Sequence, residues 1–198
     1  MPFKPESKAA IVERAAVSFN QRGYWGTSMS DLAQRVGTSK GAIYGHVGSK
    51  DELAVLAFDH AAAATRQAVD RRLDGVEDPM DWLHAFVDAW GELNGAPAVP
   101  GGCPVMKVAT EAPEARKVVG QRAREVLTEW VARIRLAISL AKQAGRARED
   151  VDPQAEAEFL FATLEGAGLM ARTNGSVDCS RRTVQLLHAH LDTLVPRS

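Results

Sequence analysis

The segment between residues 27 and 54 carries closely spaced signals for helix starts and stops. Ser28 and Asp31 have the spacing of a capping box, in which a hydroxyl and a carboxylate each bind a backbone amide at a helix start. Gly37 suits the left-handed residue that ends such a helix, and Ser39 can cap the next one. The spacing therefore predicts two short helices separated by a tight turn.

This pair of helices is typical of a helix-turn-helix. The second helix is expected over residues 40–46, with Ile43 and Val47 facing inward. A further capping box, formed by Ser49 and Glu52, opens a long third helix directly afterwards. Because such a unit lays its second helix in the major groove, the segment indicates binding to double-stranded DNA.

Candidate DNA contacts fall into two chemical groups. Hydroxyls at a helix start, a phenol and an ammonium suit phosphate oxygens, which position a protein on DNA. The candidates of this kind are Thr27, Ser28, Tyr44 and Lys50. Base edges or neighbouring phosphates are the expected partners of Ser39, Lys40, Gly41 and His46. Among these, Lys40 can donate to guanine, and Tyr44 can also be partly buried against the first helix.

The first 54 residues, through AAVSFNQRGYWGTSMSDLAQRVGTSKGAIYGHVGSKDEL, resemble the TetR-type family of bacterial transcriptional regulators nearly position by position. The resemblance implies a homodimeric, all-helical repressor of a palindromic operator, with a C-terminal domain controlled by a small-molecule effector. Two departures concern DNA reading. Val47 stands where many members carry Phe, and Gly45 gives the recognition helix no side chain where one is often present. We therefore expect base readout to depend on fewer contacts than usual.

The charge distribution agrees with a DNA-binding head. The whole chain has a net charge of -1, but residues 1–50 hold seven basic and three acidic residues, a balance of +4. The remainder holds 17 basic and 22 acidic residues, a balance of -5. Phosphate attraction needs local positive charge, so this split is compatible with DNA binding by the head alone. A chance asymmetry of solvated charges is the alternative.

The composition favours a globular protein without a membrane partner. Hydrophobic residues make up 45% of the 198 residues and charged residues 25%, which is ordinary for a globular domain. No apolar run approaches the length of a membrane span, and MPFKPESKAA at the start lacks the apolar stretch of a signal peptide. We expect a cytoplasmic location.

Enzyme signatures were sought as the contrasting class of function. The sequence has no GxSxG, Walker A, GxGxxG or HExxH motif. His188 and His190 do not face each other on a helix, and His84 with Asp88 is expected to form a surface hydrogen bond. We therefore predict no enzyme activity, no cofactor and no metal site. A small-molecule-binding or thiol enzyme with a basic helical head is the alternative.

An all-α architecture of nine helices is predicted along the chain. The expected helices cover residues 6–22, 29–36, 40–46, 50–73, 79–93, 104–109, 113–144, 153–172 and 180–194. A linker rich in proline and glycine, residues 94–102, separates the fifth helix from the sixth. We predict a helix-turn-helix domain over residues 1–50 and a ligand-binding and dimerisation domain over residues 51–198.

The last two predicted helices have wide apolar surfaces, which require burial on more than one side. The resemblance implies that they pair with their copies in a second subunit as a four-helix bundle. The residues assigned to that interface are Leu160, Leu164, Gly168, Leu187 and Leu191. An internal core without dimerisation is the alternative.

Aromatic residues at helical spacing mark the predicted C-terminal domain. The resemblance implies a ligand cavity there, although plain core is the alternative reading of such a stripe. The candidate ligand-binding residues are Trp82, Phe86, Trp90, Cys103, Trp130, Phe159 and Thr163. A ligand is expected to act by changing the separation of the two heads through the fourth helix.

Cys103 supports a second mode of control. It stands at a predicted helix start, with Pro104 after it and Lys107 four positions on, and both the helix start and the lysine favour a thiolate. Some members of the family sense electrophiles or oxidants through a cysteine in a similar GC segment. Simple packing of Cys103 is the alternative, and Cys179 is expected to be a second free thiol.

Overall fold

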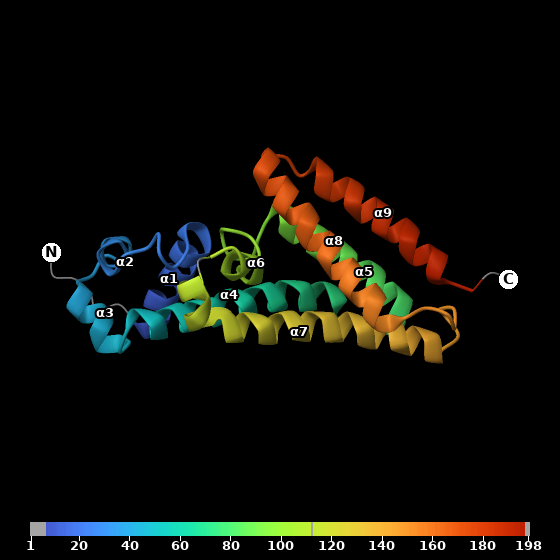
Figure 1. The fold of residues 1–198 in the computed structure, drawn as a ribbon, viewed down its shortest axis with the longest axis horizontal. Coiled ribbons are helices and arrows are strands. Elements are labelled where there is room, and N and C mark those ends of the chain that lie inside the picture. The colour runs from blue at the N-terminus through green and yellow to red at the C-terminus, as the bar shows by residue number, and fades with distance from the viewer. Residues whose placement is uncertain (1–6, 112, 197–198) are drawn as a thin grey trace. The chain divides into compact units, whose positions relative to one another are not determined.

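The computed structural model describes residues 7–111 and 113–196, and these ranges form nine helices and no strand (Figure 1). The helices are α1 (Lys8–Arg22), α2 (Met29–Val36), α3 (Lys40–His46), α4 (Lys50–Leu73), α5 (Pro79–Gly95), α6 (Pro104–Ala109), α7 (Pro113–Gln143), α8 (Pro153–Asn174) and α9 (Asp178–Leu194). The all-α prediction is confirmed. The predicted start of the first helix at Glu6 lies outside the described residues.

Local capping explains why the helices begin and end where they do. Asp78 caps α5 by accepting the N–H groups of Met80 and Asp81, while Pro79 occupies the first turn, where its missing N–H costs nothing. Asp152 caps α8 in the same way. Helix α5 continues to Gly95 and α8 to Asn174, two residues beyond each prediction, because no strong stop signal precedes those positions.

The chain divides into two compact units. Unit 1 comprises residues 7–65 and 98–126 and therefore contains α1, α2, α3 and α6 with parts of α4 and α7. Helices α1, α2 and α3 pack on one another. The largest fully buried apolar side chains in this unit are Ile11, Leu32, Ile43 and Leu53.

Unit 2 comprises residues 66–97 and 127–196. Helices α5, α8 and α9 pack pairwise against one another, and α4 and α7 contribute their remaining residues. Arg133 Nη2 lies 2.5 Å from Asp70 Oδ1, which joins α7 to α4 inside this unit. The largest fully buried apolar side chains are Leu83, Phe86, Trp90, Ile134, Ile138, Leu160, Leu164 and Leu187. The domain boundary proposed at residue 50 stays a prediction.

None of the helices in the described ranges combines the length and the apolar content that crossing a membrane requires.

Candidate nucleic-acid interface and effector region

The recognition helix α3 starts at a capped residue and turns its polar side outward. Ser39 Oγ accepts the N–H of Ala42 at 3.1 Å, which fixes the first turn. Ile43 and Val47 are buried in unit 1. The predicted contact residues on the opposite face are exposed, namely Lys40, Gly41, Tyr44 and His46. Their exposure agrees with the sequence analysis, and their contact with DNA stays a prediction.

Two glycines leave the exposed face of α3 flat. A Cβ atom on Gly45 would meet nothing within 4 Å, and one on Gly41 would come no nearer than 3.8 Å to Ser39 Oγ. Neither glycine is therefore required by packing inside unit 1. A bare backbone at these positions allows the helix to approach a partner closely.

The start of α2 has the predicted capping box. Ser28 Oγ accepts the N–H of Asp31 at 3.1 Å, and Asp31 Oδ2 accepts the backbone N–H of Ser28 at 3.1 Å. The Ser28 hydroxyl also donates to Asp31 Oδ2 at 2.7 Å. These hydrogen bonds from Ser28 hold the pKa of the Asp31 carboxyl below its usual value. Ser28 therefore has a demonstrable role in shaping the helix start.

Thr27 is buried at the turn after α1. It is only 1% exposed, and its hydroxyl is within donating distance of the carbonyl oxygens of Gly23 at 2.8 Å and Ser18 at 3.4 Å. The hydroxyl is therefore used within unit 1. A contact between Thr27 and phosphate stays a prediction.

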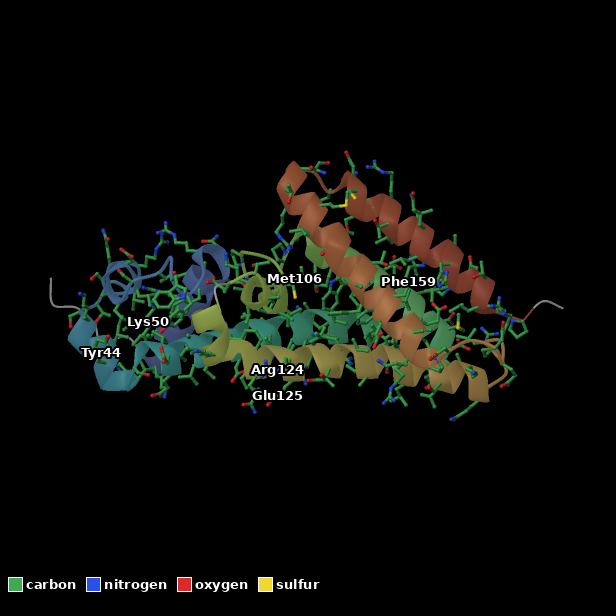
Figure 2. The ribbon with its side chains drawn as sticks, viewed as in Figure 1. Tyr44, Lys50, Met106, Arg124, Glu125 and Phe159 are labelled. Atoms are coloured by element: carbon green, nitrogen blue, oxygen red, sulfur yellow. The ribbon has the colours of Figure 1, made fainter. Side chains whose placement is uncertain are left out.

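Lys50, at the start of α4, is partly engaged within unit 1 (Figure 2). Its Nζ donates to the carbonyl oxygen of Tyr24 at 2.7 Å and lies 4.0 Å from the centre of the Tyr24 ring. Desolvation lowers the pKa of the Lys50 ammonium. Burial, reinforced by donation of the phenol to Asp51, raises the pKa of Tyr24 to about 12. Tyr24, absent from the sequence-based assignment, thus connects the turn after α1 to the start of α4.

A loop and helix α6 are fastened to the end of α1, in what we call the α1–α6 attachment. The side-chain amide of Asn20 donates to the carbonyl oxygens of Val99, Pro100 and Gly102 at 2.9 to 3.3 Å. Two further hydrogen bonds complete the attachment. Glu111 Oε1 accepts the Tyr24 N–H at 3.2 Å, and Lys107 Nζ donates to the Gln21 carbonyl at 3.4 Å. These contacts were not predictable from the sequence, because they join positions about eighty residues apart.

Cys103 belongs to unit 1 and precedes α6, with a part-buried side chain. Its side chain makes no capping hydrogen bond to the helix. Lys107, the cation predicted to favour a thiolate, donates to Gln21 of α1. Reactivity of Cys103 stays a prediction.

Three of the predicted ligand-binding aromatics form a packed cluster in unit 2. The Trp90 ring centre lies 5.0 Å from that of Trp130 and 5.5 Å from that of Phe86, and all three side chains are buried. Phe161 of α8 completes the cluster at 5.0 Å from Trp90. Phe159, two positions earlier, faces the other side of α8 and is 46% exposed. The structure therefore places Phe161, rather than Phe159, among these aromatics.

Trp82 and the end of α7 border a groove of about 470 Å³ in unit 2. The groove is lined mainly by apolar side chains, with a carboxylate and a guanidinium at its margin. The lining residues are Glu77, Pro79, Trp82, Arg133, Leu136, Ala137, Leu140 and Ala144. Leu136 and Leu140 are exposed there. Thr163 of α8 is part-buried and is not among the residues that line this groove.

The residues assigned to dimerisation are buried within a single protomer. Leu160, Leu164, Gly168, Leu187 and Leu191 all face the packed interior of unit 2. The opposite, outer faces of α8 and α9 carry large exposed apolar side chains. These are Phe159, Leu169, Met170 and Leu186. Both sides of α8 and α9 are apolar, so sequence periodicity selected the side that the protomer itself covers.

The predicted surface pair of His84 and Asp88 has a different arrangement in the structure. Asp88 Oδ1 lies 2.7 Å from His188 Nε2, and His188 Nδ1 lies 2.6 Å from His84 Nδ1. The ring centres are 4.9 Å apart and the two ring planes are nearly parallel, so the imidazoles contact each other through their Nδ1 atoms. These contacts connect α5 to α9. No group of three or more metal-ligating side chains is positioned around a common point in the part of the chain that the structure describes.

Comparison with known proteins finds two family models along the chain. Residues 11–56 match the model for bacterial regulatory proteins of the tetR family. Residues 79–187 match the model described as the tetracyclin repressor-like C-terminal domain. Together the two matches cover the helix-turn-helix and most of unit 2.

Similar proteins and structures agree with both models. A TetR transcriptional regulator from Chloroflexus aurantiacus J-10-fl is 32% identical, with a TM-score of 0.91 and 96% of each chain covered. The HTH-type transcriptional repressor AcnR of Corynebacterium jeikeium is 28% identical over 180 residues, which span 86% of this chain and 85% of that protein. The HTH-type transcriptional repressor DhaR of Mycobacterium sp. is 23% identical over 162 residues, 79% of this chain and 78% of that protein.

Proposed function

Because this chain belongs to the TetR family of bacterial transcriptional regulators, we propose that it is a homodimeric repressor which leaves a palindromic operator when a small molecule binds. The observation that carries the proposal is the outward face of α3. Lys40, Tyr44 and His46 are exposed there, while Ile43 and Val47 anchor the helix in unit 1. A short helix held in this way can enter a major groove without rearranging its own core.

Dimerisation through the outer faces of α8 and α9 follows from their composition. A single copy leaves Phe159, Leu169, Met170 and Leu186 exposed, and an apolar surface of this kind favours burial against another protein. A Cβ atom on Gly166 would meet nothing within 4 Å, so the backbone of α8 is open to close approach there. A second copy is the proposed occupant, because two heads on a two-fold axis match a palindromic site.

The groove beside Trp82 is the proposed effector site. Its volume of about 470 Å³ lies within the usual range of roughly 300 to 1,000 Å³ for small-molecule sites. The hollow among α1, α4 and α6 in unit 1 is only about 40 Å³, too small for a typical effector. An apolar molecule would fit the apolar walls of the groove.

The α1–α6 attachment supports a route by which the heads would respond. Helix α7 lines the groove through Arg133, Leu136 and Leu140, and its earlier residues lie in unit 1 with α6. Displacement of α6 would act on α1 through Asn20 and Glu111. Two heads must fit half-sites roughly 34 to 36 Å apart, or a multiple of that spacing, so a small change in their separation releases DNA.

Two experiments test this proposal. Selection of DNA from a random or genomic pool should enrich a palindrome, and failure to enrich any sequence would contradict the repressor assignment. A screen of small apolar molecules should then find compounds that release the selected duplex. Trp82→Ala should lose this response while retaining DNA affinity. The control Asp74→Ala, at an exposed position outside the groove, should keep the response. Equal responses in both variants would place the effector elsewhere.

A further inference from the structure

We propose that Trp25, in the turn between α1 and α2, is an additional DNA-backbone contact whose indole N–H donates to a phosphate oxygen. This inference rests on the proposed DNA-binding function and adds a residue outside the helix-turn-helix assignment. The Trp25 side chain is 60% exposed. Indole offers one N–H donor and no acceptor, which matches an oxygen-rich partner. Tryptophan also combines this donor with a flat apolar surface that can lie against a sugar.

The turn that carries Trp25 is held on both sides. A Cβ atom on Gly26 would lie 2.3 Å from the carbonyl oxygen of Arg22, so the backbone packs tightly there. Thr27 donates to Gly23 at 2.8 Å, and the N–H of Tyr24 donates to Glu111 at 3.2 Å. The exposed indole is therefore presented from a constrained backbone. Ordering Trp25 on DNA would cost little backbone entropy.

Trp25 also lies beside Lys50, which is a predicted phosphate contact. Its ring centre is 5.4 Å from that of Tyr24, in an edge-to-face contact, and 5.8 Å from Lys50 Nζ. Trp25 and Lys50 thus belong to one connected region of unit 1. A DNA strand contacted by Lys50 would pass within reach of the indole.

The chemistry of this contact separates it from contacts made by cations or by base-reading residues. A neutral indole releases no condensed counterion when it binds phosphate, so it leaves the salt dependence unchanged. Phosphate contacts carry no direct sequence information, so preference among related sites should also be unchanged. Loss of Trp25 should therefore lower the affinity for DNA without changing its salt dependence or the preference among related sites.

The first test compares full-length wild type, Trp25→Phe, Trp25→Ala and the control Leu127→Ala on the duplex enriched by wild type. Leu127 is an exposed residue outside the proposed contacts. Trp25→Phe keeps an aromatic ring but removes the N–H, and should weaken binding about fivefold, the size expected for one hydrogen bond. Trp25→Ala should weaken binding at least as much. The control should bind like wild type. Salt slopes and relative affinities for single-base operator variants should match wild type in every case.

The second test uses the tryptophan emission itself. The other three of the four tryptophans, Trp82, Trp90 and Trp130, lie in unit 2. The emission that wild type has and Trp25→Phe lacks should change in intensity or wavelength as the duplex is added. Unchanged affinity in both Trp25 variants, with no change in that emission, would overturn the contact while leaving the DNA-binding proposal intact. Failure of wild type to enrich any duplex would instead overturn both proposals.

Discussion

Asn20 and Gly101 are in backbone contact: a Cβ atom on Gly101 would lie 2.4 Å from the Asn20 carbonyl oxygen. Gly101 also has a φ of 118°, in a region that other residues rarely adopt. The contact brings the loop before α6 against the last turns of α1, where the Asn20 amide can reach the carbonyl groups of Val99, Pro100 and Gly102. A residue near the end of the first helix thereby organises a segment about eighty residues away.

Gly101→Ala should destabilise the protein more than Gly75→Ala. Both glycines have positive φ, which costs on the order of 1 kcal/mol for a residue with a side chain, but only Gly101 faces a steric clash. A Cβ atom on Gly75 meets nothing within 4 Å. Urea unfolding of the two variants gives the comparison. Equal losses in the free energy of unfolding would show that the loop yields without strain.

Asn20→Ala should weaken the α1–α6 attachment and the effector response together. The substitution leaves carbonyl groups of the loop without their amide donor, at a cost of about 1 to 3 kcal/mol. Operator release by an effector should then need a higher concentration, because α6 no longer displaces α1 as directly. Chemical unfolding and effector titration on the selected duplex measure the two effects. An unchanged release curve in a destabilised Asn20→Ala protein would remove the attachment from the proposed route.

Leu186→Glu should disrupt dimerisation, whereas Leu187→Glu should disrupt folding. Leu186 is 71% exposed, so a glutamate there should leave the protomer folded but place a charge in the proposed interface between copies. Leu187 is 2% exposed, and a glutamate there should unfold unit 2 at a cost of several kcal/mol. Light scattering and circular dichroism distinguish folded monomers from unfolded chains. A folded dimer in Leu186→Glu would move the interface away from α9.

Lys40→Ala and Lys50→Ala should separate base reading from phosphate binding. Lys40 is exposed on α3, and its loss should change the ranking of operator variants. Lys50→Ala should lower affinity for all duplexes similarly and reduce the salt slope by about one unit, as expected for one phosphate contact. Binding measured at several salt concentrations tests both expectations. A Lys50→Ala protein with unchanged affinity and salt slope would confine this lysine to its contact with Tyr24.

The capping box of α2 should make the free energy of unfolding decrease as the pH falls in the acidic range. Hydrogen bonds from Ser28 lower the pKa of the folded Asp31 carboxyl, so its stabilising effect is complete above the unfolded value of about 3.8 and disappears as pH falls through the lower folded value. Asp31→Asn should therefore reduce the loss of stability over this acidic range. Asp74→Asn, which removes an exposed carboxylate from the end of α4, serves as the control. Identical acid-unfolding curves for Asp31→Asn and wild type would show that the box contributes nothing measurable.

The helix boundaries were predictable because they depend on interactions between neighbouring residues. Which side of a helix is buried was not predictable, because it depends on packing against distant parts of the chain. The serine at position 28 and the glycine at position 37 specify α2 through interactions within a few residues. By contrast, the choice between Phe159 and Phe161 depends on which side of α8 the rest of unit 2 covers. The same uncertainty affected Leu187, since α9 has apolar residues on both sides. The burial of Thr27 was not predictable for a related reason: a hydroxyl near a helix start can bond to the chain itself as readily as to a ligand.

The open surface around Gly45 gives the recognition helix room to diversify. Side chains can be introduced there without displacing a neighbour, and most would also favour the helix, since glycine is a poorer helix former than alanine by about 1 kcal/mol. A single codon change can thus add a new group to the exposed face of α3 while the fold is preserved. After gene duplication, two copies of such a regulator could cease to compete for one operator without first passing through an unstable intermediate.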